Sequence, residues 1–203
     1  MYIINLIRNL IEKRHVALIS KIITQKGSDC VFKKSSSVLL NDISNSEDII
    51  LGNKVWMFGS LISTNHGKII MGENSKIYPG SMIGAVKSVT IGANTVIAFD
   101  VIIIDNNNHP LNPFDREIMV NTPIGSEEKL WKYSISAPIV IGNNVWVCQK
   151  ARICKGVTIG DNAIIAANSV VTKDVPANSI AAGNPAKIVK TDIHLLPRVF
   201  AGR

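Results

Sequence analysis

Aliphatic residues occupy every sixth position between Pro138 and Thr172. When this stretch is divided into hexads, each hexad begins with Ile or Val, at Ile141, Val147, Ile153, Ile159, Ile165 and Val171. The second position is small throughout, from Gly142 to Ala166. A period of six matches neither an α-helix nor a simple strand. It is typical of a parallel β-helix in which each hexad forms one of three flat sides, so that about eighteen residues complete one turn.

The hexads predict an interior of stacked aliphatic side chains. We expect the first-position residues to point inward and the small second residues to let the backbone turn each corner. The same expectation extends toward the N-terminus, through Val55, Leu61, Ile77, Ile83, Ile97 and Ile103. Few aromatic residues and many β-branched ones suit such a narrow core.

An aliphatic stretch that ends in glycine recurs along the chain. It begins at Ile49, Ile69, Val89, Ile139 and Val157, with spacings of 20, 20, 50 and 18 residues. The interval of 50 contains one turn and roughly thirty residues that do not belong to the repeat. Loops longer than about 12–15 residues without structure of their own are usually functional or disordered. The insertion 106–137 is therefore the predicted functional loop.

The ends of the chain differ from the repeats. Residues 2–24 carry aliphatic side chains at roughly helical spacing, which predicts one or two helices that cap the open end of the first coil. We divide the chain into a cap with a degenerate first coil (1–48), a β-helix domain (49–190) and a tail that includes a short helix (191–203).

The N-terminal segment is not expected to cross a membrane. Lys13, Arg14 and Lys21 interrupt its apolar residues too often for a span, and a signal-peptide cleavage pattern is missing. A basic amphipathic helix that rests on anionic lipid is the alternative. We expect a cytoplasmic protein without stable membrane association, with contact at the inner face of the membrane left open.

The charge balance favours an acidic ligand. The formal net charge is +7 and the pI is about 9.4, which suits a polyphosphate cofactor or an anionic glycan. Nucleic acid is not expected, because no basic run with interleaved aromatics occurs. Cys148 and Cys154 occupy second positions of hexads and are interpreted as corner packing, and an odd cysteine count suits a reducing compartment. We expect no metal site.

One of the four histidines lies where the regular repeat gives way to the insertion. This residue, His109, follows a run of Asp105 and three asparagines. Histidine suits general-base catalysis, because its ordinary pKa is near 6.5. A base that works through one ring nitrogen needs an acceptor at the other, and Asp105 or a backbone carbonyl could supply it. The run could equally be an Asx-rich turn.

The chain resembles the hexapeptide-repeat acyltransferases over about residues 51–190, above all the O-acetyltransferases that modify galactosides, maltose and cell-surface polysaccharides. The resemblance rests on the hexads, the pair His109-Pro110, the pair Val145-Trp146 and the motif Ala-Gly-Asn-Pro-Ala-Lys at 182–187. It implies an all-β fold, namely a left-handed parallel β-helix. It also implies a homotrimer with active sites between subunits and acetyl-CoA as the donor. The catalytic histidine of the family matches His109.

The resemblance also assigns residues to the donor and the acceptor. Trp146 matches a residue that lines the groove for the acetyl and pantetheine end of the cofactor, whereas Trp56, in a matching hexad, has no such support. Backbone groups near Ala151, Ala167 and Gly183 correspond to those that hold the pantetheine chain. Basic residues beyond the catalytic coil are candidates for the phosphates, namely Lys173, Lys187 and Lys190. Asn108, Arg116, Trp131 and Tyr133 of the insertion are candidates for binding the sugar acceptor.

We therefore expect direct transfer of an acetyl group from acetyl-CoA to a hydroxyl of a sugar or cell-surface polysaccharide, with His109 as general base. N-acetylation of an amino-sugar nucleotide on the same scaffold is the alternative. A zinc enzyme would need a third histidine beside His66 and His109, and a non-catalytic β-helix would leave the insertion without a role. The acceptor-side residues of galactoside enzymes have no clear match around residues 80–86, so the acceptor stays open.

Overall fold

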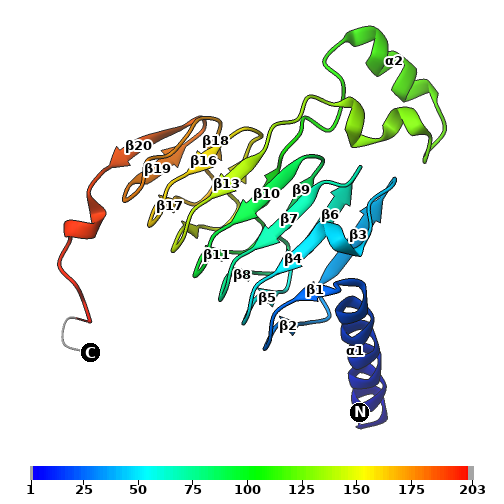
Figure 1. The fold of residues 1–203 in the computed structure, drawn as a ribbon, viewed down its shortest axis with the longest axis horizontal. Helices are drawn as coiled ribbons and strands as arrows, with labels where there is room; N and C mark the ends of the chain where they lie inside the picture. The colour runs from blue at the N-terminus through cyan, green and yellow to red at the C-terminus, as the bar shows by residue number, and fades with distance from the viewer. Residues whose placement is uncertain (1, 201–203) are drawn as a thin grey trace.

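The computed structural model describes residues 2–200, with side chains from residue 9 onward; residues 1 and 201–203 of the expected cap and tail lie outside this part. The chain winds into a coil whose strands stack into three sheets (Figure 1). Every strand pair in the described chain is parallel except the last, β19 with β20. The expected β-helix is therefore confirmed, while its left-handed sense remains an expectation from the resemblance.

The strands alternate among the three sheets in chain order. Sheet A contains β1 (Gln25–Lys26), β4 (Ile49–Leu51), β7 (Lys68–Met71), β10 (Ser88–Ile91), β13 (Ile139–Ile141) and β16 (Thr158–Ile159). Sheet B contains β2 (Val31–Phe32), β5 (Trp56–Met57), β8 (Lys76–Ile77), β11 (Val96–Ile97), β14 (Trp146–Val147), β17 (Ile164–Ile165), β19 (Ile180–Gly183) and β20 (Ala186–Lys190). Sheet C contains β3 (Ser37–Asn41), β6 (Ser60–Thr64), β9 (Met82–Ala85), β12 (Ile102–Ile104), β15 (Arg152–Ile153) and β18 (Val170–Val171).

The core is the stack of aliphatic side chains that the hexads predict. All six first-position residues from Ile141 to Val171 are buried, and so are Val55, Leu61, Ile77, Ile83, Ile97 and Ile103. The fifth positions, such as Val145 and Ala163, are buried as well. Two of the six positions in each hexad therefore fill the narrow interior.

The corners do not turn at the small second residue, as the sequence suggested. The left-handed backbone conformation falls two residues later, at the fourth position, as at Asn144 (φ 54°) and Asn162 (φ 60°). The second residue is small for another reason. A Cβ atom at Gly160 would lie 2.4 Å from the backbone nitrogen of Ala177 in the next coil. Close stacking of coils, rather than backbone freedom, excludes a side chain there.

The residues that lengthen some coils all fall on one edge of the prism. Consecutive core residues stand six apart from Ile91 to Ile97 and on to Ile103, but Leu61 precedes Met71 by ten. We call the connections from sheet C to sheet A the insertion edge; they comprise residues 42–48, 65–67, 86–87, 105–138 and 154–157. The connections from sheet A to sheet B form the asparagine edge, which comprises residues 27–30, 52–55, 72–75, 92–95, 142–145, 160–163 and 176–179.

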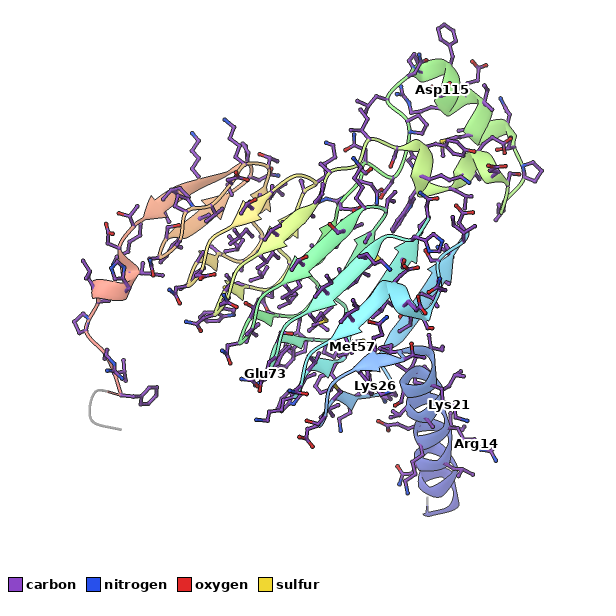
Figure 2. The ribbon with its side chains drawn as sticks, viewed as in Figure 1. Arg14, Lys21, Lys26, Met57, Glu73 and Asp115 are labelled. Carbon is purple, nitrogen blue, oxygen red and sulfur yellow. The ribbon has the colours of Figure 1, made fainter. Side chains whose placement is uncertain are left out.

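The N-terminal cap is a single helix, α1 (Tyr2–Ile22). Its C-terminal half meets the coils, where Ile19 and the following Ile23 are buried in the common core and His15 Nε2 lies 2.7 Å from the carbonyl oxygen of Ser36. The N-terminal part of the helix extends beyond the strands in the direction of Arg14 (Figures 1 and 2). Within the described residues, no helix is long and apolar enough to cross a membrane.

The insertion is not a plain loop. It contains the helix α2 (Pro113–Asn121) and two 3-10 turns, η2 (Glu127–Lys129) and η3 (Trp131–Tyr133). Asn112 caps α2, since its side-chain oxygen accepts a hydrogen bond from the backbone N–H of Phe114 at 2.9 Å, and Pro113 suits the first helical position. Figure 1 shows α2 standing off the strands beside the ends of β3, β6 and β9.

The C-terminal end closes with a hairpin that the sequence did not predict in full. The Gly-Asn-Pro turn joins β19 to β20, and β20 returns antiparallel along sheet B. The expected tail helix is a single 3-10 turn, η4 (Ile193–Leu195), and another such turn, η1 (Ser46–Asp48), lies on the insertion edge. Pro197 follows this turn by two residues, and a proline disfavours continuation of a helix.

Candidate functional site

His109 lies on the insertion edge, where the chain leaves β12 and enters the insertion. Its side chain is exposed and contributes to a cleft of about 200 Å³, which Arg116, Met119, Val120 and Lys129 also line. The cleft thus combines an imidazole, two cationic side chains and an apolar wall from α2. This combination provides a base beside groups that attract anions.

Asp105 does not orient the His109 ring, which corrects one of the sequence-based expectations. Its carboxylate is fully buried and accepts hydrogen bonds from the backbone N–H groups of Val86 (2.9 Å) and Lys87 (2.7 Å) and from Asn106 (3.2 Å). Burial raises the pKa of Asp105, and these hydrogen bonds oppose the rise. Through these hydrogen bonds, the carboxylate connects the β9–β10 connection to the next coil along the chain.

Asn108 provides an unused hydrogen-bond acceptor next to His109. Its backbone adopts the left-handed conformation (φ 64°), and its N–H donates to the side chain of Asn106 at 2.8 Å. Its Oδ1 atom is buried without a hydrogen-bond partner among the described residues. An unpaired buried carbonyl is costly, so a hydrogen bond to this atom would stabilise the turn.

Two aromatic residues of the insertion, Trp131 and Tyr133, have contacts within the fold. A Cβ atom at Gly84 would lie 2.7 Å from the Trp131 ring, so the ring packs directly on the β9 backbone. Tyr133 donates to Glu127 at 2.6 Å and shares a separate cleft with Met119. The Glu127 hydrogen bond raises the pKa of Tyr133. Trp131 therefore anchors the insertion, whereas Tyr133 keeps an exposed ring face.

Lys132 fixes the insertion to the first coil. Its ammonium group lies 3.2 Å from a carboxylate oxygen of Asp42 and 3.2 Å from one of Glu127. The hydrogen bonds that the Lys132 ammonium group donates to Glu127 and Asp42 raise the pKa of Lys132. The insertion thus leaves the coil at Asp105 and reaches down the insertion edge as far as the end of β3.

The residues expected to hold the cofactor lie on sheet B and beside it. Trp146 is 53% exposed, and the register of β14, β17, β19 and β20 aligns it with Lys190. Ala167, Gly183 and Lys187 are exposed near the same end of the coil. Gly183 and Lys187 belong to β19 and β20 of sheet B, as Trp146 belongs to β14, and Ala167 lies in the connection from sheet B to sheet C.

Two cofactor assignments do not fit this surface. Ala151 is buried, and its backbone N–H and C=O are engaged with Cys148 and Ile102 within the coils. Lys173 follows β18 and therefore belongs to the side of the insertion edge rather than to sheet B. The coil ladder uses the backbone of Ala151 because that residue occupies a fifth, inward-facing position.

His109 and Trp146 lie on different sides of the prism. The insertion edge joins sheets C and A, and in a three-sided coil this edge is opposite sheet B. Trp146 is on the outer face of sheet B, next to a row of rings formed by Trp56, Phe58, Tyr78 and Phe99. One chain by itself therefore separates the candidate base from the candidate cofactor surface.

A polar cluster on the insertion edge went unrecognised in the sequence. Asp48 is fully buried and contacts His66 and Lys68 from the next coil. The spacings from Asp48 to these residues are 18 and 20, which are one coil length. Reading charged residues at coil spacing would have found the cluster.

Comparison with known proteins identifies the scaffold. The family described as bacterial transferase hexapeptide (six repeats) matches residues 138–173. The galactoside O-acetyltransferase of Escherichia coli K12 is 35% identical over 126 residues, which are 59% of this chain and 62% of that protein. The polysialic acid O-acetyltransferase of Escherichia coli O1:K1 is 36% identical over 136 residues, or 66% of this chain and 40% of that protein. The alignments span less than two thirds of either relative.

The solved structures include a galactoside acetyltransferase in complex with coenzyme A. It is 28% identical to this chain, with a TM-score of 0.58, and the match covers 86% of this chain and 68% of the other. Its bound coenzyme A shows that a fold of this kind can hold that cofactor. The hexads, the three-sided coil and these relatives together show that the chain is similar to the hexapeptide-repeat acetyltransferases.

Proposed function

We propose that this protein transfers an acetyl group from acetyl-CoA to a hydroxyl of a sugar or polysaccharide, with His109 as the general base. A sugar hydroxyl is scarcely ionised at neutral pH, so a base must take its proton as the oxygen attacks the thioester carbonyl. An acid or base in position contributes about 10²–10⁴-fold to the rate. The leaving group is the thiolate of coenzyme A.

The observation that supports this function best is the position of His109. It is exposed in a cleft at the point where a regular coil is interrupted, and Arg116 and Lys129 line the same cleft. The free Oδ1 atom of Asn108 can accept a hydrogen bond from an acceptor hydroxyl. Base, acceptor-binding group and apolar wall are thus contributed by one short stretch of chain.

Direct transfer fits these residues better than a covalent cysteine intermediate. The thiolate is the nucleophilic form of cysteine. Burial raises the pKa of the Cys148 thiol, which disfavours that form. In addition, none of the residues that line the His109 cleft is a cysteine.

The separation of His109 and Trp146 supports a homotrimer. A donor bound along sheet B of one chain can reach His109 only if that base belongs to a neighbouring chain. The rings of Trp56 (37% exposed), Phe99 (48% exposed) and Trp146 (53% exposed) form an apolar strip of the kind that is usually covered. In this arrangement, the Trp146 side of one protomer faces the insertion edge of the next, and Lys187 and Lys190 neutralise the phosphates of coenzyme A.

Replacing His109 tests the chemical assignment. We expect His109→Ala to lower the release of coenzyme A in the presence of a sugar acceptor by about 10²–10⁴-fold. The circular dichroism spectrum and the melting temperature should stay unchanged, because the ring is exposed. Arg14→Ala, at an exposed position of α1, is the control and should keep full activity. A His109→Ala enzyme with normal turnover would exclude this residue as the base.

Mixing two inactive variants tests the shared site. Chains with His109→Ala are unfolded and refolded together with chains that carry Trp146→Ala. If the base and the donor surface come from different protomers, mixed trimers contain intact sites, and activity should return to a substantial fraction of wild type. No recovery in trimers shown to be mixed by mass would mean that each site lies within one chain.

A further inference from the structure

In the polar cluster on the insertion edge, the Asp48 carboxylate orients the imidazole ring of His66. The Asp48 carboxylate accepts hydrogen bonds from the Asn45 N–H (2.8 Å) and from the Lys68 ammonium (2.8 Å), and its Oδ2 atom lies 3.1 Å from Nδ1 of His66. Burial raises the pKa of Asp48, but the hydrogen bonds from Lys68, Asn45 and His66 outweigh it, so the net pKa is lowered. At neutral pH this carboxylate is therefore ionised and can only accept.

This geometry fixes which nitrogen of His66 is free. Nδ1 must carry a hydrogen to meet a carboxylate, so a neutral ring has its lone pair on Nε2. The side chain of His66 is 48% exposed, and its backbone N–H is held at 3.0 Å by the hydroxyl of Ser44. The cluster thus holds an imidazole with a hydrogen-bond acceptor directed toward solvent.

His66 shares the insertion edge with His109. The connection 65–67 follows β6, and β6, β9 and β12 are successive strands of sheet C. Two strand spacings correspond to about 10 Å. The insertion extends along this edge in the direction of His66, because Trp131 packs on Gly84 and Lys132 pairs with Asp42. A ligand long enough to extend along the insertion from His109 would reach the corner that bears His66.

The same corner has further unused hydrogen-bonding capacity. The hydroxyl of Thr64, two residues before His66, is buried without a hydrogen-bond partner among the residues that the structure describes. A buried hydroxyl without a partner is uncommon and costs free energy. The corner therefore has two groups that could bind a ligand: the Nε2 atom of His66 and the hydroxyl of Thr64.

We propose that His66, oriented by Asp48, is a second acceptor subsite that binds a hydroxyl of a sugar unit next to the one acetylated at His109. This inference rests on the proposed acetyltransferase function. A separation of two coils is too long for one small alcohol to touch both rings, so the natural acceptor is an oligosaccharide or polysaccharide. The role of His66 is binding rather than proton transfer.

Comparing acceptors by length tests this subsite. The probes are galactose, glucose and sialic acid, each beside its tri- or tetrasaccharide. A neutral hydrogen bond is worth roughly 0.5–1.5 kcal/mol, so His66→Asn should raise the KM for oligosaccharides by about 2–12-fold. The kcat, the KM for acetyl-CoA and the KM for monosaccharides should not change.

Lys54→Asn is the matched control. Lys54 belongs to the coil before the corner that bears His66 and has the same left-handed backbone, with φ 58° against 59°. It lies on the asparagine edge, so its replacement should leave every acceptor unaffected. Asparagine tolerates this conformation, and the melting temperatures of both variants should match that of the wild type.

The outcomes separate the two proposals. If the wild type acetylates oligosaccharides and His66→Asn leaves their KM unchanged, the subsite is excluded while the acetyltransferase function stands. An equal rise of KM for monosaccharides and oligosaccharides would also exclude it. If the wild type releases coenzyme A with no probe, the proposed function itself is contradicted. A loss of length preference confined to His66→Asn supports the subsite.

Discussion

The asparagine edge and the insertion edge belong to the same coils but are built differently. On the asparagine edge, one left-handed residue turns each corner, and the side chains stack, as in the hydrogen bonds from Asn144 to Asn162 and from Asn162 to Asn178, both 2.9 Å. On the insertion edge, the corners vary from two residues to more than thirty. There the polar groups include two fully buried carboxylates, Asp48 and Asp105.

This difference suggests that the asparagine edge stabilises the fold, whereas the insertion edge carries the candidate binding groups. The asparagine edge repeats one four-residue corner with a single left-handed residue, which is Asp29 or Lys54 in the first two corners and asparagine in the others. The insertion edge is irregular, and two of its corners are held by hydrogen bonds to a buried carboxylate. Asp105 supports the β9–β10 connection, and Asp48 supports the corner that bears His66. The irregular edge is also the one that displays His109.

The largest expected effect on stability is at Asp105. Asp105→Ala would leave the buried N–H groups of Val86 and Lys87 without an acceptor, and each such loss costs about 1–3 kcal/mol. We expect the free energy of unfolding to fall by about 2–5 kcal/mol in a urea titration. Asp161→Ala is the control, because Asp161 accepts the backbone N–H of Asn143 at 2.7 Å in the same way but is exposed. Equal losses would mean that burial does not distinguish the two edges.

A smaller, pH-dependent effect is expected at Asp48. Because the pKa of Asp48 is lowered in the folded chain, its ionised form stabilises the fold. That contribution is present above the ordinary pKa of about 3.9 and is lost as the pH falls through the lower folded value. Asp48→Asn should therefore cost about 1–3 kcal/mol at pH 7, and the difference from wild type should shrink below about pH 4. A difference that is as large at pH 3 as at pH 7 would show that the charge is not responsible.

The regular part of the molecule was predictable from the sequence because its pattern repeats. A first-position aliphatic such as Ile153 has one possible environment in a stack of hexads, and its burial follows from the period alone. The position of His109 could be predicted for the same reason, since it marks the point where the repeat is interrupted. The spacing of Ile69 and Val89 also showed that extra residues had entered those coils.

The irregular edge was less predictable, because its contacts depend on side-chain direction. Asp105 and His109 are four residues apart, yet the carboxylate turns inward to two amides of the previous coil, and sequence spacing does not show this choice. The anchoring of Trp131 on Gly84 depends on a contact between segments almost fifty residues apart. The α2 helix was missed because its nine residues are too few to establish a clear helical period.

The smallest effect tests the asparagine edge by itself. Asn162 has φ 60° and hydrogen bonds to Asn144 and Asn178. Alanine in this conformation is strained by about 1–2 kcal/mol, whereas glycine adopts it freely. Both Asn162→Ala and Asn162→Gly lose the side-chain hydrogen bonds, so the difference between them isolates the backbone term. We expect the glycine variant to be more stable than the alanine variant by about 1 kcal/mol in thermal unfolding. If the alanine variant is the more stable one, the stacked side chains rather than the backbone conformation account for the preference for asparagine at this edge.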